Sequence, residues 1–294
     1  MKINLIFNLI KQTFKEWQKD KASRLAAALA YYTVFSLAPL LIIIIAIAGA
    51  IFGEEAARGE IVGQIQGLVG QQGAEIIETA IENADKPDVS NIASILSIIA
   101  LLFGASGVFA QLQEALNAIW EVKPKPEKGI MNFIRKRFLS FSAVLGIGFL
   151  LLISLVMSAA LSALNNYMSG FLPGIDWLWQ ILNLAISFTI ITLLFALMYK
   201  FLPDVKIKWN DVWVGAIITT ILFIFGKFAL GLYLGRGSFG STYGAAGSLV
   251  IILAWVYYSA QILFFGAEFT QVYARRFGSR IVPDENAMFV PKEK

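Results

Sequence analysis

Cysteine and histidine are both absent from this chain of 294 residues. Their absence excludes disulfides, thiol nucleophiles, imidazole bases and the usual zinc ligands. Charged residues are scarce as well, at 15% of the chain, whereas a soluble domain has about a quarter. No glycine-rich phosphate loop, metal-ligand spacing or nucleophile beside a base stands out. We therefore expect no catalytic residue, no metal and no cofactor, and the low charge argues against a soluble protein.

Hydrophobic residues make up 57% of the chain, and the mean hydropathy is +0.69. They are concentrated in long runs, several of which exceed the roughly 18 uncharged residues that mark a membrane span. The sequence therefore predicts an all-α polytopic membrane protein, a single membrane domain over 1–294 with six transmembrane helices plus amphipathic surface helices. The predicted spans are about 25–52, 91–120, 138–164, 177–199, 212–234 and 244–273.

Three polar or amphipathic segments flank these spans. Residues 3–20 place apolar side chains on one face and lysines on another, which predicts a helix at the membrane interface. Leu5 and Leu9 fall outside this stripe, so part of the opposite face is expected to contact protein. Residues 53–90 combine acidic residues with apolar ones at helical spacing, which predicts an external amphipathic segment on the membrane surface or capping the bundle. We expect the polar tail, 276–294, to be cytoplasmic and loosely ordered.

The distribution of basic residues predicts the orientation. Of the 24 Lys and Arg residues, 20 lie on one side of the predicted spans and only Arg58, Lys86 and Arg236 on the other, with Lys227 inside a span. Basic segments stay in the cytoplasm because they resist translocation. Both termini are therefore predicted to be cytoplasmic, and 53–90 external.

Two stretches carry a resemblance to a known family: ALAYYTVFSLAPL in the first span, and GAAGSLVIILAWVYYSAQILFFGAEFTQVYARR from Gly244 to Arg276. With the acidic external segment and the six-span layout, they resemble the YihY/BrkB family of bacterial inner-membrane proteins, formerly labelled ribonuclease BN. The resemblance covers roughly residues 10–280. It implies a multi-pass protein of the bacterial inner membrane, in a family linked to virulence and envelope integrity, and suggests movement of lipids or lipid-like glycoconjugates.

The old nuclease label can be tested against the residues. Metal-assisted RNA cleavage requires clustered carboxylates or histidines beside a basic groove on the cytoplasmic side. Here histidine is absent and the acidic cluster is predicted to be external. We therefore expect no ribonuclease activity, no nucleic-acid partner and no enzyme.

Polar and small residues form stripes along several predicted spans. Gly104, Gly107, Gln111 and Glu114 share one helical face, and Gln261 lies close to the face of Glu268. Small and amide residues serve helix packing, but a carboxylate in hydrocarbon costs more than packing requires. One hypothesis is a cytoplasm-facing cavity that binds substrate through Tyr31, Tyr32, Gln111, Glu114, Lys227, Arg236, Gln261 and Glu268. For Lys227 and Arg236 the alternative is that they reach the outer interface.

A second set of residues is predicted to act in packing or as hinges: Pro39, Gly104, Gly107, Gly244 and Gly247. Pro39 is expected to kink the first span because its ring removes a backbone donor. The glycine-rich segment 235–248 is either a tight external loop or a hinge that re-enters the membrane.

Three functions follow from these features. The leading one is a transporter or flippase of a lipid or lipid-like amphiphile that supports the cell envelope, with membrane lipids as partners. The alternative is a non-catalytic membrane scaffold that binds an envelope protein through 53–90. A lipid-modifying enzyme would depend on Glu114 and Glu268 as its carboxylate pair. Substrate, energy source and oligomeric state stay open.

Overall fold

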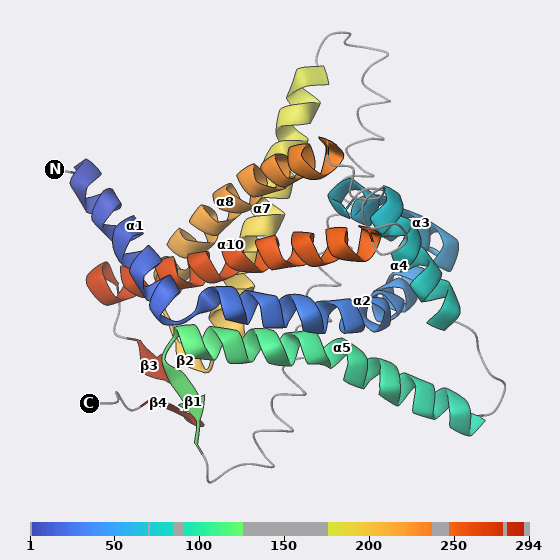
Figure 1. Cartoon of the computed structure of the whole chain (residues 1–294), viewed down its shortest axis with the longest axis horizontal. Helices are drawn as coiled ribbons and strands as arrows, with labels where there is room; N and C mark the ends of the chain where they lie inside the picture. The colour runs from blue at the N-terminus through green and yellow to red at the C-terminus, as the bar shows by residue number, and fades with distance from the viewer. Residues whose placement is uncertain are drawn as a thin grey trace.

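The computed structural model describes residues 2–69, 71–84, 91–125, 176–236, 247–278 and 281–290. The predicted span 138–164 and Gly244 lie outside these ranges. The described chain is mostly helical (Figure 1). Its helices are α1 (Lys2–Lys19), α2 (Ala22–Phe52), α3 (Glu54–Val69), α4 (Gln71–Ala84), α5 (Asn91–Ile119), α7 (Asp176–Phe201), α8 (Trp209–Arg236) and α10 (Gly247–Phe277).

Four helices within the described ranges are long and apolar enough to cross a membrane. These segments are Ala22–Ala50 in α2, Ile181–Phe201 in α7, Trp209–Leu230 in α8 and Leu249–Phe277 in α10. Each exceeds the roughly 18 residues that a bilayer core requires. They overlap the predicted spans 25–52, 177–199, 212–234 and 244–273, and α5 occupies the predicted span 91–120.

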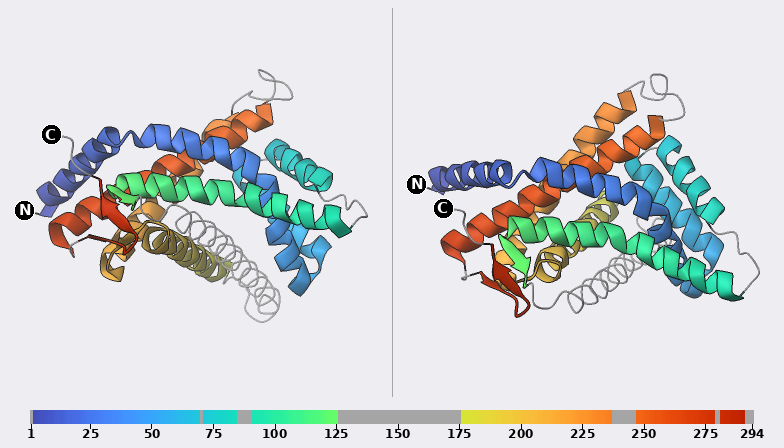
Figure 2. Two further views of the ribbon diagram at one scale, coloured as in Figure 1. Left: turned by 90° about the horizontal axis from the view of Figure 1, so that it is seen from below. Right: turned by 60° about the horizontal axis from the view of Figure 1, so that its bottom comes forward.

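The long helices pack into a bundle in which α2 contacts α5 and α10, and α8 contacts α7 and α10. Figure 2 shows α2 and α5 running side by side. Large side chains such as Trp120, Tyr199 and Phe264 are fully buried inside the bundle. Buried alanines, a residue type that lets backbones approach closely in membranes, lie beside these large side chains: Ala22, Ala26, Ala115, Ala196, Ala216, Ala260 and Ala267.

Glycines allow the closest approaches between helices. A Cβ atom on Gly104 of α5 would lie 3.0 Å from the Cγ atom of Pro39 in α2, and one on Gly107 would lie 3.2 Å from the Ser36 hydroxyl. Gly247 is buried at the start of α10. Two contacts between α8 and α10 are tighter still. A methyl group on Gly266 would overlap the hydroxyl of Thr219, and one on Gly215 would overlap the hydroxyl of Thr270.

Helices α3 and α4 form a hairpin against the end of α2, at the opposite end of the bundle from α1 (Figure 1). Ile77 and Ile81 of α4 are buried against Ile45 of α2 and Trp255 of α10. The described part of 53–90 packs against the end of the bundle, where α2 and α10 bury Ile77 and Ile81 and partly bury Ile61 and Ile65. Its placement relative to a membrane stays a prediction.

Four short strands lie at the other end of the bundle: β1 (Val122–Pro124), β2 (Val205–Lys206), β3 (Val282–Pro283) and β4 (Ala287–Phe289). They form two antiparallel pairs, in which Val122 lies opposite Phe289 and Val205 opposite Pro283. The expectation of a loosely ordered tail is therefore wrong for residues 281–290. Backbone donors and acceptors of the tail pair with two distant loops, a long-range gain that the polar composition of the tail does not reveal.

Helix α1 lies across the C-terminal part of α10. Leu9 is buried against Phe269 and Val272, as expected for a residue outside the apolar stripe. Leu5, the other residue outside the stripe, is exposed, as are Phe7, Ile10 and Phe14. We call this end of the molecule the sheet end. Four segments meet there: the turn into α2, the chain after α5, the α7–α8 connection and the tail. All four segments belong to the side that is rich in Lys and Arg.

Candidate functional site

A cavity of about 310 Å³ lies among the membrane helices. Thr33, Ser36 and Ser259 supply its only polar side chains among the described lining residues, and the Thr33 hydroxyl donates to the carbonyl of Leu29 at 2.7 Å. The other described lining residues are apolar: Leu29, Leu37, Leu40, Val108, Phe109, Leu112, Ile191, Leu194, Phe195, Met198, Phe223, Val256, Ala260 and Leu263. These walls suit a hydrocarbon chain better than a polar solute.

The predicted substrate-binding residues lie elsewhere. Tyr31, Tyr32, Glu114 and Lys227 are exposed, and Gln111 and Gln261 are half-buried. Glu268 is fully buried. None of these seven side chains lines the cavity, and the side chain of Arg236 lies outside the structural description. Substrate binding by these eight residues stays a prediction.

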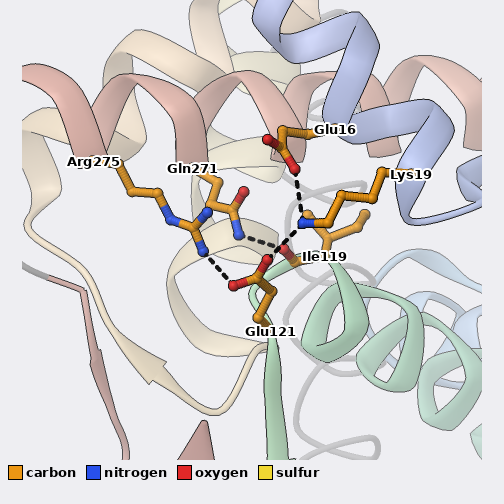
Figure 3. A network of polar contacts seen from close by, with 6 residues as sticks. All are labelled: Glu16, Lys19, Ile119, Glu121, Gln271 and Arg275. Atoms are coloured by element: carbon orange, nitrogen blue, oxygen red, sulfur yellow. Dashed lines mark hydrogen bonds and ion pairs between the residues drawn. The ribbon is translucent and has the colours of Figure 1, made fainter. Parts of the chain in front are cut away.

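A polar network connects three parts of the chain at the sheet end (Figure 3). The Glu121 carboxylate, just after α5, accepts a hydrogen bond from Lys19 Nζ of α1 and another from Arg275 Nη2 of α10, each at 2.9 Å. Lys19 also donates to Glu16 at 3.0 Å, and Gln271 Nε2 donates to the carbonyl of Ile119. The network thus joins α1, α5 and α10 through charge-assisted bonds.

The backbone is bent at two residues of this end. Lys21, between α1 and α2, and Glu121, between α5 and β1, both have φ of 54°. Residues with a Cβ atom seldom adopt this left-handed conformation, and they keep it where surrounding contacts hold them. At Glu121 the contacts are the two ion pairs and the hydrogen bond from Val290 N to its carbonyl, 2.8 Å long.

The charged groups of the network change one another's pKa values. Hydrogen bonds from Lys19 to Glu121 and Glu16 raise the pKa of the Lys19 ammonium. Partial burial raises the pKa of the Glu121 carboxyl, but Lys19 and Arg275 outweigh burial, so the net pKa is lowered. Asp20 behaves in the opposite way, because burial raises the pKa of its carboxyl and no described side chain bonds its buried Oδ2 atom.

Glu268 lies beside this network on α10, in the part of the helix that α1 covers. Neither of its carboxyl oxygens has a hydrogen-bond partner among the described residues. The same holds for Gln271 Oε1 and for the indole nitrogens of Trp17 and Trp120. Buried polar atoms are nearly always paired, so this concentration at one place in a well-packed end marks a candidate site.

A second polar cluster involves Asp204, in the connection after α7. Its carboxylate accepts from Asn117 Nδ2 at 2.8 Å and Gln113 Nε2 at 3.3 Å, and its backbone N donates to Asn117 Oδ1 at 2.7 Å. This cluster ties α5 to the α7–α8 connection. The sequence interpretation missed Asp204 because its partners are distant in the chain. For Glu121, the available signal was an acidic residue directly after a predicted span, on the side of the predicted topology that carries most Lys and Arg residues.

Long apolar helices with a bilayer-length core and exposed aromatic side chains define the class as a helical membrane protein. Comparison with known families then identifies the group. Residues 13–290 match the family described as virulence factor BrkB, and the chain belongs to this family. The resemblance inferred from the two sequence stretches is thereby confirmed.

Individual relatives agree with this assignment. The chain is 27% identical to a UPF0761 membrane protein of Psychrobacter sp., over 89% of this chain and 47% of that protein. It is 28% identical to a UPF0761 membrane protein of Pseudomonas aeruginosa, over 84% of this chain and 58% of that one. The chain therefore spans about half the length of these curated relatives.

A relative of similar length is a putative ribonuclease-like protein of Bacillus subtilis, YfkH. The identity is 22%, over 95% of this chain and 98% of that protein. No solved structure matches the chain.

Proposed function

We propose that this protein is a transporter or flippase of a lipid or lipid-like amphiphile in the bacterial inner membrane, in support of the cell envelope. The observation that carries the proposal is the apolar cavity among the membrane helices. Its volume of about 310 Å³ is at the lower end of the range for ligand sites, roughly 300–1,000 Å³. A cavity of this size with hydrocarbon walls suits one acyl or isoprenoid chain.

The proposal includes six transmembrane helices with both termini in the cytoplasm. Four candidate helices, α5 and the apolar run 138–164 supply the six spans. The described segments at the sheet end belong to the side of the predicted topology that carries 20 of the 24 basic residues, and basic segments favour the cytoplasmic side. On this orientation α3 and α4 are external, and α1 presents Phe7, Ile10 and Phe14 to the inner membrane surface.

We also propose that the protein is not an enzyme. Glu114, one member of the only carboxylate pair considered for catalysis, is exposed, whereas Glu268 is fully buried. Across the described ranges, no three Asp or Glu side chains are grouped closely enough to hold a metal ion. The ribonuclease-like name of the Bacillus relative is a description of that protein.

One observation favours the scaffold function as a second candidate. The α3–α4 hairpin buries its apolar face in the bundle and leaves Glu54, Glu55 and Glu75 exposed. An acidic face held on a rigid support suits a basic partner protein. Replacing the three residues with Gln tests this function, because a scaffold loses its partner in cross-linking whereas a transporter keeps lipid movement.

A matched pair of substitutions tests the cavity. Leu194 lines the cavity from α7, and Leu184 is exposed on the same helix. Leu194→Trp places an indole in the cavity, so we expect lipid movement in proteoliposomes to fall at least to one half. Leu184→Trp should leave it unchanged. The assay uses fluorescent lipids with several head groups and follows their transfer between leaflets.

Two outcomes contradict the transport proposal. One is a set of flip rates equal to those of protein-free liposomes for every lipid tried. The other is an equal effect of both tryptophan variants, which would show that the cavity has no special role. Size-exclusion profiles of both variants establish that each is folded.

A further inference from the structure

Glu268 is the buried group that the proposed cavity does not explain. It lies on α10 within a span long enough to cross the membrane, and its side chain is fully buried. Both carboxyl oxygens lack a hydrogen-bond partner among the described residues. A carboxylate in such surroundings is costly as an anion, and ionisable groups inside membrane helices usually mark ion or proton pathways.

The charges near Glu268 repel an anion there more than they attract it. Asp20 and Glu16 supply the larger, repulsive part, and Lys19 and Arg275 supply a smaller attraction. The nearby cations are engaged elsewhere, because Lys19 and Arg275 both bond Glu121.

The charged groups of the sheet end come from every neighbouring element. They include Glu16, Lys19 and Asp20 of α1, Lys21 and Arg24 at the start of α2, Glu114 of α5, Glu121 after it, Lys200 of α7, Asp211 of α8, and Arg275 and Arg276 of α10. None of these cations bonds Glu268 among the described contacts, so a bound proton is the simplest way to remove its charge.

We propose that Glu268 is a proton-binding site that couples movement of the amphiphile to a proton gradient, an inference that rests on the transport function proposed above. In the loaded state one carboxyl oxygen holds the proton and the group is neutral. On release this O–H bond breaks, the electron pair stays on the carboxylate, and a water molecule takes up the proton. We assign to Asp20, a half-buried carboxyl group whose Oδ2 atom has no described partner and which interacts electrostatically with Glu268, the passage of the proton from this water towards the sheet end.

Infrared difference spectroscopy tests proton binding without any transport assay. The whole protein, reconstituted in lipid, is titrated through neutral and alkaline pH while the carbonyl stretch of protonated carboxyl groups is followed. We expect a band at neutral pH that is lost at alkaline pH in the wild type. Glu268→Gln should abolish the band, and Glu114→Gln, at an exposed carboxylate, should retain it. A wild type without the band, or Glu268→Gln with it, overturns the proposal.

Lipid movement under an imposed pH gradient then tests coupling. The wild type should move lipid faster with the gradient than without it, and Glu268→Gln should lose the gradient-dependent part of the rate. Equal gradient dependence in both proteins overturns the coupling. If the infrared band behaves as expected but no lipid moves under any condition, the transport function fails while the proton site stands. Glu268→Gln keeps the shape of the side chain, and its thermal melting in detergent shows whether it folds.

Discussion

At the scale of single residues, Glu121 joins more of the molecule than any other side chain in the network of Figure 3. It holds α1 through Lys19 and α10 through Arg275, while its backbone carbonyl accepts from Val290. Its left-handed conformation orients the carboxylate towards both cations. Because α1 and α10 both bind this one carboxylate, loss of its charge should weaken the contact of both helices with the chain after α5.

Glu121→Gln should lower stability by about 1 kcal/mol at neutral pH, since partly exposed ion pairs contribute about 0.2–1 kcal/mol each. The pKa of Glu121 is lower in the folded than in the unfolded protein. Its contribution is therefore present above the unfolded value, about 4.5, and is lost as pH falls through the folded value. Thermal melting in detergent from pH 7 downwards should show the difference between wild type and variant shrink.

Asp20→Asn provides a control of opposite sign. Burial raises the pKa of Asp20, so its charge destabilises the folded protein above the folded pKa, and this effect vanishes below the unfolded value. The amide should therefore raise the melting temperature at neutral pH and leave it unchanged in acid. If Asp20→Asn and Glu121→Gln shift the melting temperature in the same direction at neutral pH, burial does not oppose the ionisation of Asp20 as described.

At the scale of elements, the contact between α8 and α10 depends on small residues and hydroxyls. Tyr199 of α7 donates to the carbonyl of Leu263 at 2.8 Å and shares a hydrogen bond of 2.9 Å with Thr219. Gly266 lies against both hydroxyls. In a membrane, where the lipid is as apolar as the side chains, such close packing and interhelical hydrogen bonds hold helices together.

Gly266→Ala should destabilise the protein by about 1–3 kcal/mol, because the added methyl group overlaps Thr219 and forces the helices apart. Gly63→Ala on α3 is the matched control, since a Cβ atom there meets nothing within 4 Å. In a helix interior the same change should stabilise by about 0.5–1 kcal/mol. Equal melting temperatures for both variants would show that α8 and α10 are less closely packed than described.

At the scale of the whole molecule, the two ends differ in charge and in structure. The sheet end carries basic residues and paired strands, and the other end carries the acidic α3–α4 hairpin. The helices that connect the two ends are the apolar ones, so we propose that the bilayer lies between the ends. On the proposed orientation the basic end faces the cytoplasm.

Cysteine labelling checks this orientation, and the chain offers a clean background because it has no cysteine of its own. Glu55→Cys on α3 and Lys123→Cys on β1 both place a thiol at an exposed position. An impermeant maleimide should label residue 55 in cells with a permeable outer layer and intact inner membrane. Residue 123 should react only after lysis. The reverse pattern would invert the molecule and every proposal that depends on its orientation.

The sequence by itself determined that this is a membrane protein, where its described long helices lie in the chain, and which family it belongs to. Span length and hydropathy depend on residues that are neighbours in the chain, so 25–52, 177–199 and 212–234 could be located without a structure. The grouping of the basic loops at one end followed from the alternation of spans. Leu9 could be separated from the apolar stripe of α1 because helical periodicity is local too.

Tertiary structure decided which polar residues are buried and what surrounds the cavity. Glu114 and Glu268 had similar standing in the sequence, yet the first is exposed and the second has no contact with solvent. A helical wheel assigns residues to a face of one helix, but it does not set how that helix is rotated against its neighbours. The pairing of the tail with β1 and β2, and of Glu121 with Lys19 and Arg275, depended in the same way on contacts between segments far apart in the chain.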